Sequence, residues 1–400
     1  MPLSRVQSCF LQALGTVARG EELHLSLSRG EWQALFQLAA QQHVLALLYE
    51  PACRSEAAQQ YPELFAAYRQ AVVTQVGHQL ARAADFRALY GHLRQRGLHP
   101  LVVKGQLCDR LYPSRCRRKA VDDDLLIPSD ELAACHQALL ELGLHTDTPP
   151  EQLAAADEIS YFSDHLYIEL HQRLFSSAPD APDDMNVFFR QVHRAPMELD
   201  GYLSMPPQEH LLLLLLHAYK HFIYSGVGLR QVVDVGLWAR AYNDRLDWEL
   251  LRQQCRQVHA EVFAAALFRI LRERLELPVP GAWETEEDVE PLLLDMLDGG
   301  AFGAESLSRL HTSTMTLNAI RASRTGQRSG LLPSVFPPRT YLQGRYPWLK
   351  RRPWLLPAAW LARLLHYLVE ILRHPHNRPD ESVKLARERI ELLRYYQVME

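Results

Sequence analysis

The hydrophobic pattern of the chain changes its period twice, and this change constrains the fold more than any other feature. Residues 1–98 repeat apolar side chains every three or four positions, as helices do. Residues 99–205 instead hold short β-branched and alternating segments that are typical of strands. From residue 206 to 324 the helical spacing returns. The sequence therefore predicts a helical N-terminal region at 1–98, an α/β unit at 99–205 and a helical domain at 206–324.

The central unit is predicted in more detail by its turn residues. Ser129 can cap a helix, Gly143 can end it, and prolines separate the following segments. The expected strands cover 100–103, 120–127, 159–163 and 165–171, and the expected helices cover 105–112 and 129–142. This unit therefore combines a small sheet with helices.

Residues 325–400 are expected to form a proline-rich arm followed by two helices, because prolines between 325 and 357 are too frequent for one regular element. The segment 354–373 is apolar, but Arg363, His366 and Glu370 interrupt it, so it lacks the roughly 20 apolar residues of a membrane span. We expect a buried C-terminal helix there. The basic residues before it leave a helix at a membrane interface as the alternative.

Composition narrows the class of protein. The chain has 400 residues, of which 48% are hydrophobic and 22% are charged, as in soluble globular proteins. Its 43 Lys and Arg against 47 Asp and Glu give a net charge of -4, which argues against a general nucleic-acid binder. The six cysteines show no CxxC spacing and predict reduced thiols rather than disulfides or a zinc site. The first twenty residues lack the apolar stretch of a signal peptide, and we expect a cytoplasmic protein.

Three consecutive carboxylates, Asp122, Asp123 and Asp124, precede the apolar end of the second expected strand. Alternate residues of a strand share a face, so Asp122 and Asp124 point the same way, about 7 Å apart by strand rise. Two metal ions about 4 Å apart fit between such groups. Asp123 points to the opposite, apolar face, where an unpaired carboxylate is costly, so we expect Asp123→Ile to be tolerated.

A further carboxylate, Glu169, lies on the polar face of the segment 165–171, together with Tyr167 and His171. It is available to join Asp122 and Asp124 around a hard cation. Three carboxylates without cysteine predict Mg²⁺ or Mn²⁺ as the cofactor.

Cationic residues flank these carboxylates. Lys104 and Gly105 stand at a strand-to-helix turn, where glycine lets the backbone approach a phosphate and the helix N-terminus favours an anion. Arg118 belongs to a basic run just before the aspartates. A phosphate turn, a basic segment and metal carboxylates in this order indicate phosphoryl or nucleotidyl transfer.

In these motifs the chain resembles the uncharacterised nucleotidyltransferases of the DNA polymerase β superfamily. The family core is L-K-G followed by R-x-x-x-D-x-D-L-L, with a later [D/E]-L-H and helical H-A-x-K-H and R-x-x-x-D segments. The matching positions are 101–105, 118–126, 169–171, 217–221 and 230–234, with a terminal Pro, Tyr-Leu and Arg-Tyr-Pro pattern at 338–347. The resemblance covers about residues 30–350.

The resemblance implies an α+β fold, in which a polymerase β-like core with a mixed sheet and flanking helices is joined to N- and C-terminal helical regions. It implies metal-dependent transfer of a nucleoside monophosphate from an NTP to an unidentified small-molecule, peptide or protein acceptor. The implied catalytic metal ligands are Asp122, Asp124 and Glu169. The residues implied at the nucleotide are Lys104, Gly105, Arg118, His217, His221, Arg230 and Asp234.

Alternatives remain for the function and for the helical residues. An NTP-dependent phosphotransferase would use the same groups, and a catalytically inactive nucleotide-binding or scaffold protein would fit two departures from the family pattern. These are Asp123 in place of an apolar residue and Gln106 in place of a small one. His217 and His221 could be packed histidines or a zinc pair, and Arg230 with Asp234 could form an ion pair within one helix.

Overall fold

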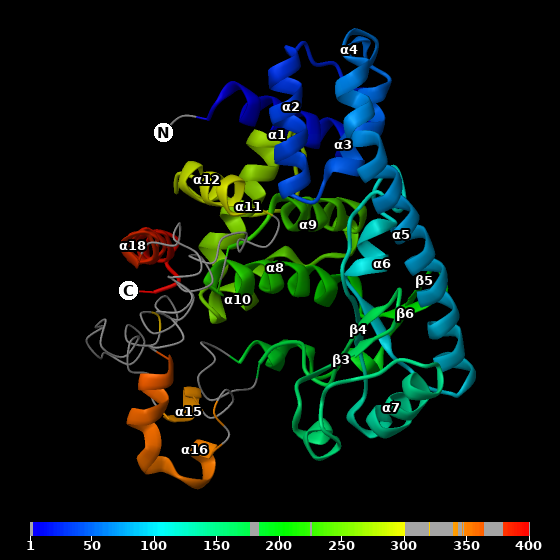
Figure 1. Ribbon diagram of the computed structural model, residues 1–400, viewed down its shortest axis with the longest axis vertical. Helices are drawn as coiled ribbons and strands as arrows, with labels where there is room; N and C mark the ends of the chain where they lie inside the picture. Colours follow the sequence, from blue (N-terminus) through cyan, green and yellow to red (C-terminus); the bar gives the residue numbers. More distant parts are fainter. Residues whose placement is uncertain are drawn as a thin grey trace.

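The computed structural model describes residues 3–176, 184–224, 226–300, 320, 339–342, 346, 348–363 and 379–399. The N-terminal region is helical, as predicted. Its helices are α1 (Arg5–Ala18), α2 (Arg29–Gln41), α3 (Leu45–Cys53), α4 (Glu56–Gln60) and α5 (Pro62–Gln95). Ser4 and Ser28 begin α1 and α2 with capping boxes, because each serine accepts from a backbone amide that the helix leaves unpaired. Helices α1 to α4 form one end of the molecule, and α5 runs from them along the side of the sheet (Figure 1).

The central unit contains a mixed four-stranded sheet with the order β1-β2-β4-β3. Its strands are β1 (Leu101–Val103), β2 (Asp123–Leu126), β3 (Glu158–Phe162) and β4 (Tyr167–His171). Strands β2 and β4 are parallel, whereas β1 pairs with β2 and β3 with β4 in antiparallel fashion. All four predicted strands are present, and the mixed sheet among helices confirms the α+β fold class.

Short helices and a hairpin complete this unit. They are α6 (Gly105–Asp109), α7 (Leu132–Glu141), the hairpin β5 (Met197–Leu199) and β6 (Tyr202–Ser204), and the 3-10 helices η1 (Ser129–Glu131), η2 (Pro150–Ala155), η3 (Met185–Phe189) and η4 (Val192–Arg194). The predicted helix at 129–142 is thus divided into η1 and α7.

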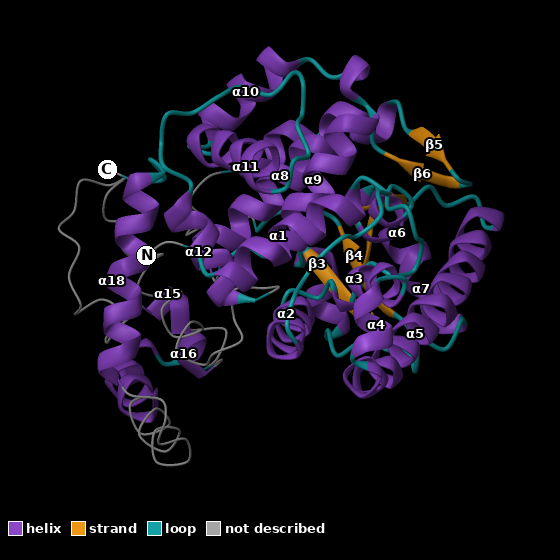
Figure 2. Cartoon of the chain, turned by 90° about the horizontal axis from the view of Figure 1, so that it is seen from above, coloured by secondary structure: helices purple, strands orange, loops and turns teal. Residues whose placement is uncertain are grey.

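The helical domain packs over one face of the sheet. Its elements are α8 (Pro207–Tyr224), α9 (Leu229–Ala241), η5 (Asn243–Arg245), α10 (Trp248–Gln257), α11 (Glu261–Arg274) and α12 (Glu290–Gly299). Seen from above, the strands lie between α8 and α9 on one side and α5 and α7 on the other (Figure 2). On the α7 side, His136 is hydrogen-bonded to Tyr161 of β3 at 2.7 Å. The helical regions and the sheet share one hydrophobic core, whose buried members range along the sequence from Phe10 to Met399.

The last part of the chain contains α15 (Arg339–Leu342), α16 (Trp348–Arg351), η6 (Pro353–Leu355) and α18 (Pro379–Tyr395). A small separate cluster joins Leu342, Leu349 and Ala359. The predicted burial of 354–373 is wrong for its described portion, because Trp354 is 73% exposed and Leu361 is 59% exposed. Apolar side chains are buried only where another element covers them, and in this portion the small cluster buries Ala359 and covers Leu355, Leu356 and Trp360 only in part. Residues 364–373 lie outside the described residues. None of the helices in the described ranges is both long and apolar enough to cross a membrane.

Candidate active site

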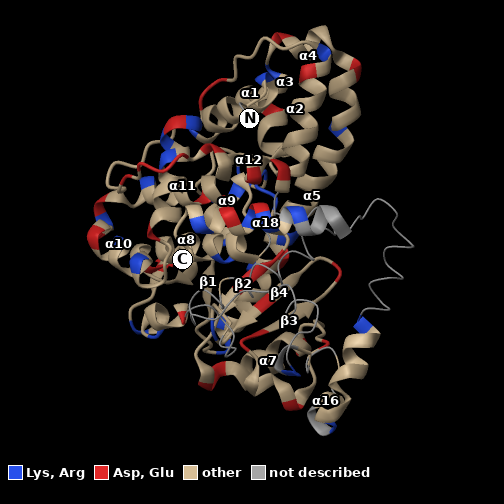
Figure 3. Ribbon diagram, turned by 90° about the vertical axis from the view of Figure 1, so that its left-hand side faces the viewer, with Lys and Arg blue, Asp and Glu red and all other residues tan. Residues whose placement is uncertain are grey.

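Charged residues of both signs are spread over the helices (Figure 3), but those that are buried concentrate in one region. The buried charged and histidine side chains are Arg82, Arg118, Asp123, Asp124, His171, His210, Arg230, Asp234 and Arg389. All except Arg389 lie in or next to the sheet, α8 and α9. Burying an ionisable group is costly unless it is paired, so this concentration marks a site.

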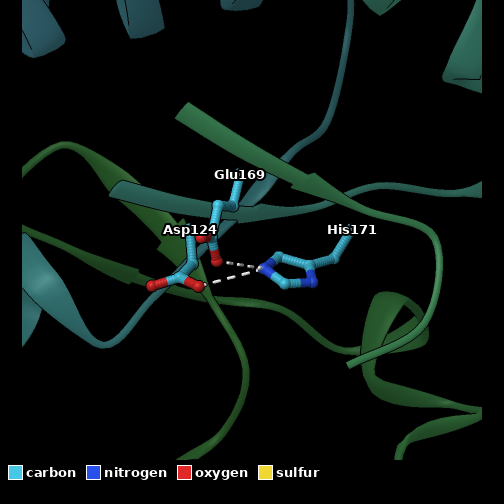
Figure 4. A group of neighbouring side chains, drawn as sticks. All are labelled: Asp124, Glu169 and His171. Atoms are coloured by element: carbon cyan, nitrogen blue, oxygen red, sulfur yellow. Dashed lines mark hydrogen bonds and ion pairs between the residues drawn. The ribbon is translucent and has the colours of Figure 1, made fainter. Parts of the chain in front are cut away.

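The parallel register of β2 and β4 builds the centre of the site. It places Asp124 opposite Glu169, and His171 two residues further along β4 lies on the same face. Both carboxylates point at one ring nitrogen of His171 (Figure 4). The Nε2 atom lies 3.0 Å from Asp124 and 3.6 Å from Glu169. One ligand atom from each of the three residues falls within 4.8 Å of the others, which suits a metal ion.

The protonation of this group follows from its pairing. Burial alone would raise the pKa of Asp124, but Lys104 and His171 outweigh it and lower the pKa below the usual range. Burial would likewise lower the pKa of His171, but its hydrogen bonds to Asp124 and Glu169 raise it to about 9. Without a metal, His171 is therefore an imidazolium between two carboxylates. The negative charges of these carboxylates favour a positive charge at this position.

This arrangement predicts a pH dependence of folding. The pKa of His171 rises from 6.5 to about 9 on folding, so its stabilising contribution is complete below about pH 6.5 and is lost as the pH rises through about 9. We expect the free energy of unfolding of the metal-free protein to fall across this interval, with a slope of up to about 1.4 kcal/mol per pH unit. Urea unfolding at several pH values, compared between wild type and His171→Gln, measures the effect. An equal slope in both proteins would contradict it.

Lys104 stands at the junction of β1 and α6 in an unusual backbone conformation, with φ 57° and ψ -127°. Residues other than glycine seldom adopt a positive φ. Such backbone strain persists only where contacts with surrounding residues keep the backbone in this conformation. Here the Lys104 amide donates to His210 at 3.3 Å, and the ammonium contacts Asp124 at 2.8 Å and His217 at 3.1 Å. The structure therefore holds the lysine ammonium on the Asp124 carboxylate.

Gly105 lies in close contact with the strand that carries the aspartates. A Cβ atom at this position would lie 3.2 Å from Asp123 Oδ1 and 3.6 Å from the carbonyl of Asp122. We expected this glycine to let the backbone approach a phosphate. The structure does not test that role, but it shows that the absence of a side chain at Gly105 lets α6 approach the strand that carries the aspartates.

A cavity of about 90 Å³ lies beside Asp124, between α6 and the helices α8 and α9. Its lining residues are Lys104, Gly105, Arg118, Asp122, Asp124, Leu214, His217, His221, Arg230, Gln231 and Asp234. The structure thus brings nearly all the site residues chosen from the sequence to one cavity. Glu169 is not among the lining residues, but it lies beside Asp124 in the group of Asp124, Glu169 and His171.

Asp122 borders this cavity but is not a member of the three-residue group with Asp124. Burial raises the pKa of Asp122, and the charge of Asp124 raises it further. The predicted trio of Asp122, Asp124 and Glu169 is therefore arranged differently, with His171 next to Glu169 and Asp124. The alternation of β4 had already put His171 on the same face as Glu169, so the sequence held the signal.

Arg118 and Asp234 are partners of each other. The Arg118 Nε and one terminal nitrogen donate to the two oxygens of Asp234 at 2.8 and 2.6 Å, and the Tyr112 hydroxyl donates to the same carboxylate at 2.8 Å. Arg230 instead donates to the carbonyl of Lys119 at 2.6 Å. Among the described residues, the Asp234 carboxylate contacts Arg118 and Tyr112 rather than forming the ion pair with Arg230 that the helix spacing allowed.

The histidines of α8 lie along one side of the helix, with His210 buried and His217 and His221 half-buried, and His210 and His217 contact Lys104. The rings of His217 and His221 meet edge to face, with centroids 4.5 Å apart. Burial, and then the charge of Lys104, lowers the pKa of both, to about 3 for His221. Neutral His217 therefore accepts a hydrogen bond from the Lys104 ammonium. Across the described ranges, no third ligand completes a zinc site with these two histidines.

Asp123 is paired, contrary to expectation. Arg82 of α5 donates from Nε to Asp123 at 2.7 Å, and the Gln106 amide donates to the other oxygen at 3.0 Å. The two residues that depart from the family pattern therefore contact each other. The participation of Arg82 could not be predicted from the sequence, because Arg82 lies 41 positions before Asp123 on a largely solvent-facing helix.

Comparison with protein families places these residues in a known sequence context. Residues 28–276 match the family described as an uncharacterised nucleotidyltransferase. The match includes the sheet and every residue of the cavity. It ends before the pattern at 338–347, so the expected extent to about residue 350 is not supported, and part of that pattern lies outside the described residues. No curated protein and no solved structure matches the chain.

Proposed function

Because the chain belongs to this family of uncharacterised nucleotidyltransferases, we propose that it transfers a nucleoside monophosphate from an NTP to an acceptor in a metal-dependent reaction. The observation that carries the proposal is the group of Asp124, Glu169 and His171 beside a cavity lined by Lys104 and Arg118. Carboxylates for metal ions next to cations for phosphate are what this chemistry requires.

The residues present fit a divalent cation. Two carboxylates and one imidazole nitrogen converge within 4.8 Å. The Lys104 ammonium and the His171 imidazolium show that the place favours positive charge, and His171 would lose its proton to serve as a ligand. A nitrogen donor beside oxygen donors favours Mn²⁺ over Mg²⁺. We therefore expect Mn²⁺ to bind more tightly, with Asp122 completing the set. A bound cation would neutralise the negative charge that develops on the transferred phosphate.

The remaining roles fall to residues around the cavity. Glu169 is half-buried at the edge of the metal group and can accept the proton of an attacking hydroxyl. Lys104 contacts Asp124 at 2.8 Å, and its ammonium would be available for a phosphate if Asp124 served as a metal ligand. The pair of Arg118 and Asp234 holds one guanidinium in a fixed orientation, and the Nη1 atom of Arg118 is buried with no hydrogen-bond partner in the described part of the chain.

Nucleotide binding requires the site to widen. A cavity of about 90 Å³ is far below the roughly 300–1,000 Å³ of ligand sites that hold molecules of this size. We expect the side chains of His217, His221, Arg230 and Gln231 on α8 and α9 to move when an NTP binds.

Incubation of the purified protein with Mn²⁺ and each of the four NTPs tests the proposal. We expect one or more NTPs to raise the melting temperature only with metal, since a ligand at 100 times its Kd stabilises by about 2.7 kcal/mol. We also expect pyrophosphate release when a cell extract supplies the acceptor. A mass increase of one NMP on the acceptor indicates nucleotidyl transfer, and an increase of one phosphate indicates a phosphotransferase. NTP binding without turnover would favour the inactive scaffold.

A further inference from the structure

The cations around the Asp124 group differ in whether they already have an anionic partner. Lys104 contacts the Asp124 carboxylate at 2.8 Å, and Arg118 contacts Asp234 at 2.6 Å. Lys220 lies close to the same group but makes neither a hydrogen bond nor an ion pair within the described part of the chain. It is half-buried, so its charge is partly removed from water without a counter-charge in contact.

The position of Lys220 follows from the geometry of α8. His217 and His221, which line the cavity, lie three residues before it and one residue after it. Successive residues are rotated by about 100° around the helix axis, so Lys220 projects from a side of α8 adjacent to the side that faces the cavity. On that flank its charge interacts with those of Glu158 on β3 and Glu169 on β4, and more weakly with that of Asp124. Lys220 therefore lies near the carboxylates that β3 and β4 present.

The environment of Lys220 opposes an isolated ammonium. Burial is the largest cause that lowers its pKa, followed by the charge of Lys104, and Glu158, Glu169 and Asp124 only partly offset these effects. A doubly charged anion beside both lysines would relieve this repulsion. Phosphate oxygens suit a lysine, which presents a compact charge on a flexible stem.

Building on the proposed function, we propose that Lys220 binds a phosphate group of the nucleotide, on the β3 and β4 side of the metal group. Lys104 and Lys220 then hold the polyphosphate from two sides while Arg118 stays with Asp234. The leaving pyrophosphate is the part of an NTP that carries most of the negative charge, so we assign Lys220 to its β- or γ-phosphate. Lys220 would be specific for the polyphosphate and indifferent to the base.

Inorganic pyrophosphate, ATP and AMP with Mn²⁺ are the probes that test this assignment by calorimetry. Lys220→Met keeps the apolar stem and removes the charge, and Lys220→Arg keeps the charge. Since a hydrogen bond to a charged group contributes about 1.5–3 kcal/mol, we expect Lys220→Met to weaken pyrophosphate and ATP binding by about 10-fold to 100-fold and AMP binding by less than about 3-fold. Lys220→Arg should recover most of the affinity. Lys384→Met is the matched control, because Lys384 is 79% exposed on α18.

The outcomes separate this inference from the proposed function. Equal pyrophosphate affinity in wild type and Lys220→Met overturns the assignment of Lys220, whatever the protein does with NTPs. Pyrophosphate binding that depends on Lys220, with no binding of any NTP, supports the anion site and overturns nucleotidyl transfer. Wild-type protein that binds neither pyrophosphate nor NTP overturns both. Melting temperatures of the variants show whether a loss reflects unfolding.

Discussion

Asp124→Asn is expected to lower the transfer rate by at least about 10³-fold. Asp124 is the carboxylate on which Lys104 and His171 converge, at 2.8 and 3.0 Å, and it is 2% exposed. Asparagine has nearly the same shape, but it carries no charge for a metal ion. A bound cation contributes several kcal/mol of transition-state stabilisation, and each 1.36 kcal/mol is a factor of ten in rate.

Two measurements separate the loss of metal from the loss of the fold. Paramagnetic resonance of Mn²⁺ measures metal affinity, which we expect to fall in parallel with pyrophosphate release. Circular dichroism shows whether the helices remain. Asp298→Asn on α12 serves as the control, because Asp298 is exposed and lies outside the site. Wild-type Mn²⁺ affinity in Asp124→Asn would show that Asp124 is not a metal ligand.

The helices and strands could be predicted from the sequence because local patterns of residues determine them. The change of hydrophobic period predicted where strands replace helices, and alternation put Glu169 and His171 on one face of β4. The orientation of strand side chains could be predicted for the same reason, since successive residues of a strand face opposite sides of the sheet. The strand order and the parallel pairing of β2 with β4 depend on contacts between distant segments and were not predicted; the family resemblance implied only a mixed sheet.

The candidate site was predictable in its members but not in their pairing. The motifs selected Lys104, Arg118 and Asp234, and the structure brings them to one cavity. The sequence could not show that Asp234 takes Arg118 as its partner, because the two residues are 116 positions apart. Nor could it show that the helical histidines are neutral, since that depends on burial beside Lys104. Pairing is a property of the tertiary structure, whereas residue type and spacing are properties of the chain.

Asp123→Ile is now expected to destabilise the protein by about 3–5 kcal/mol, in contrast to the tolerance expected from the sequence. The side chains of Arg82 and Asp123 are 6% and 1% exposed, so the substitution leaves a buried guanidinium without its counter-charge. It also removes the acceptor of the Gln106 amide at the start of α6. Urea unfolding measures the change in the free energy of unfolding.

The double variant Arg82→Met with Asp123→Ile tests the cause of that loss. If the cost comes from an unpaired buried charge, removing both charges should restore most of the stability, because apolar replacement of a buried pair is often neutral or stabilising. The difference between the double variant and the sum of the single variants gives the coupling energy directly. If the double variant is as unstable as the sum predicts, the loss comes from packing around Gly105 and α6. In that case Arg82 of α5 does not compensate for the departures from the family pattern at positions 106 and 123.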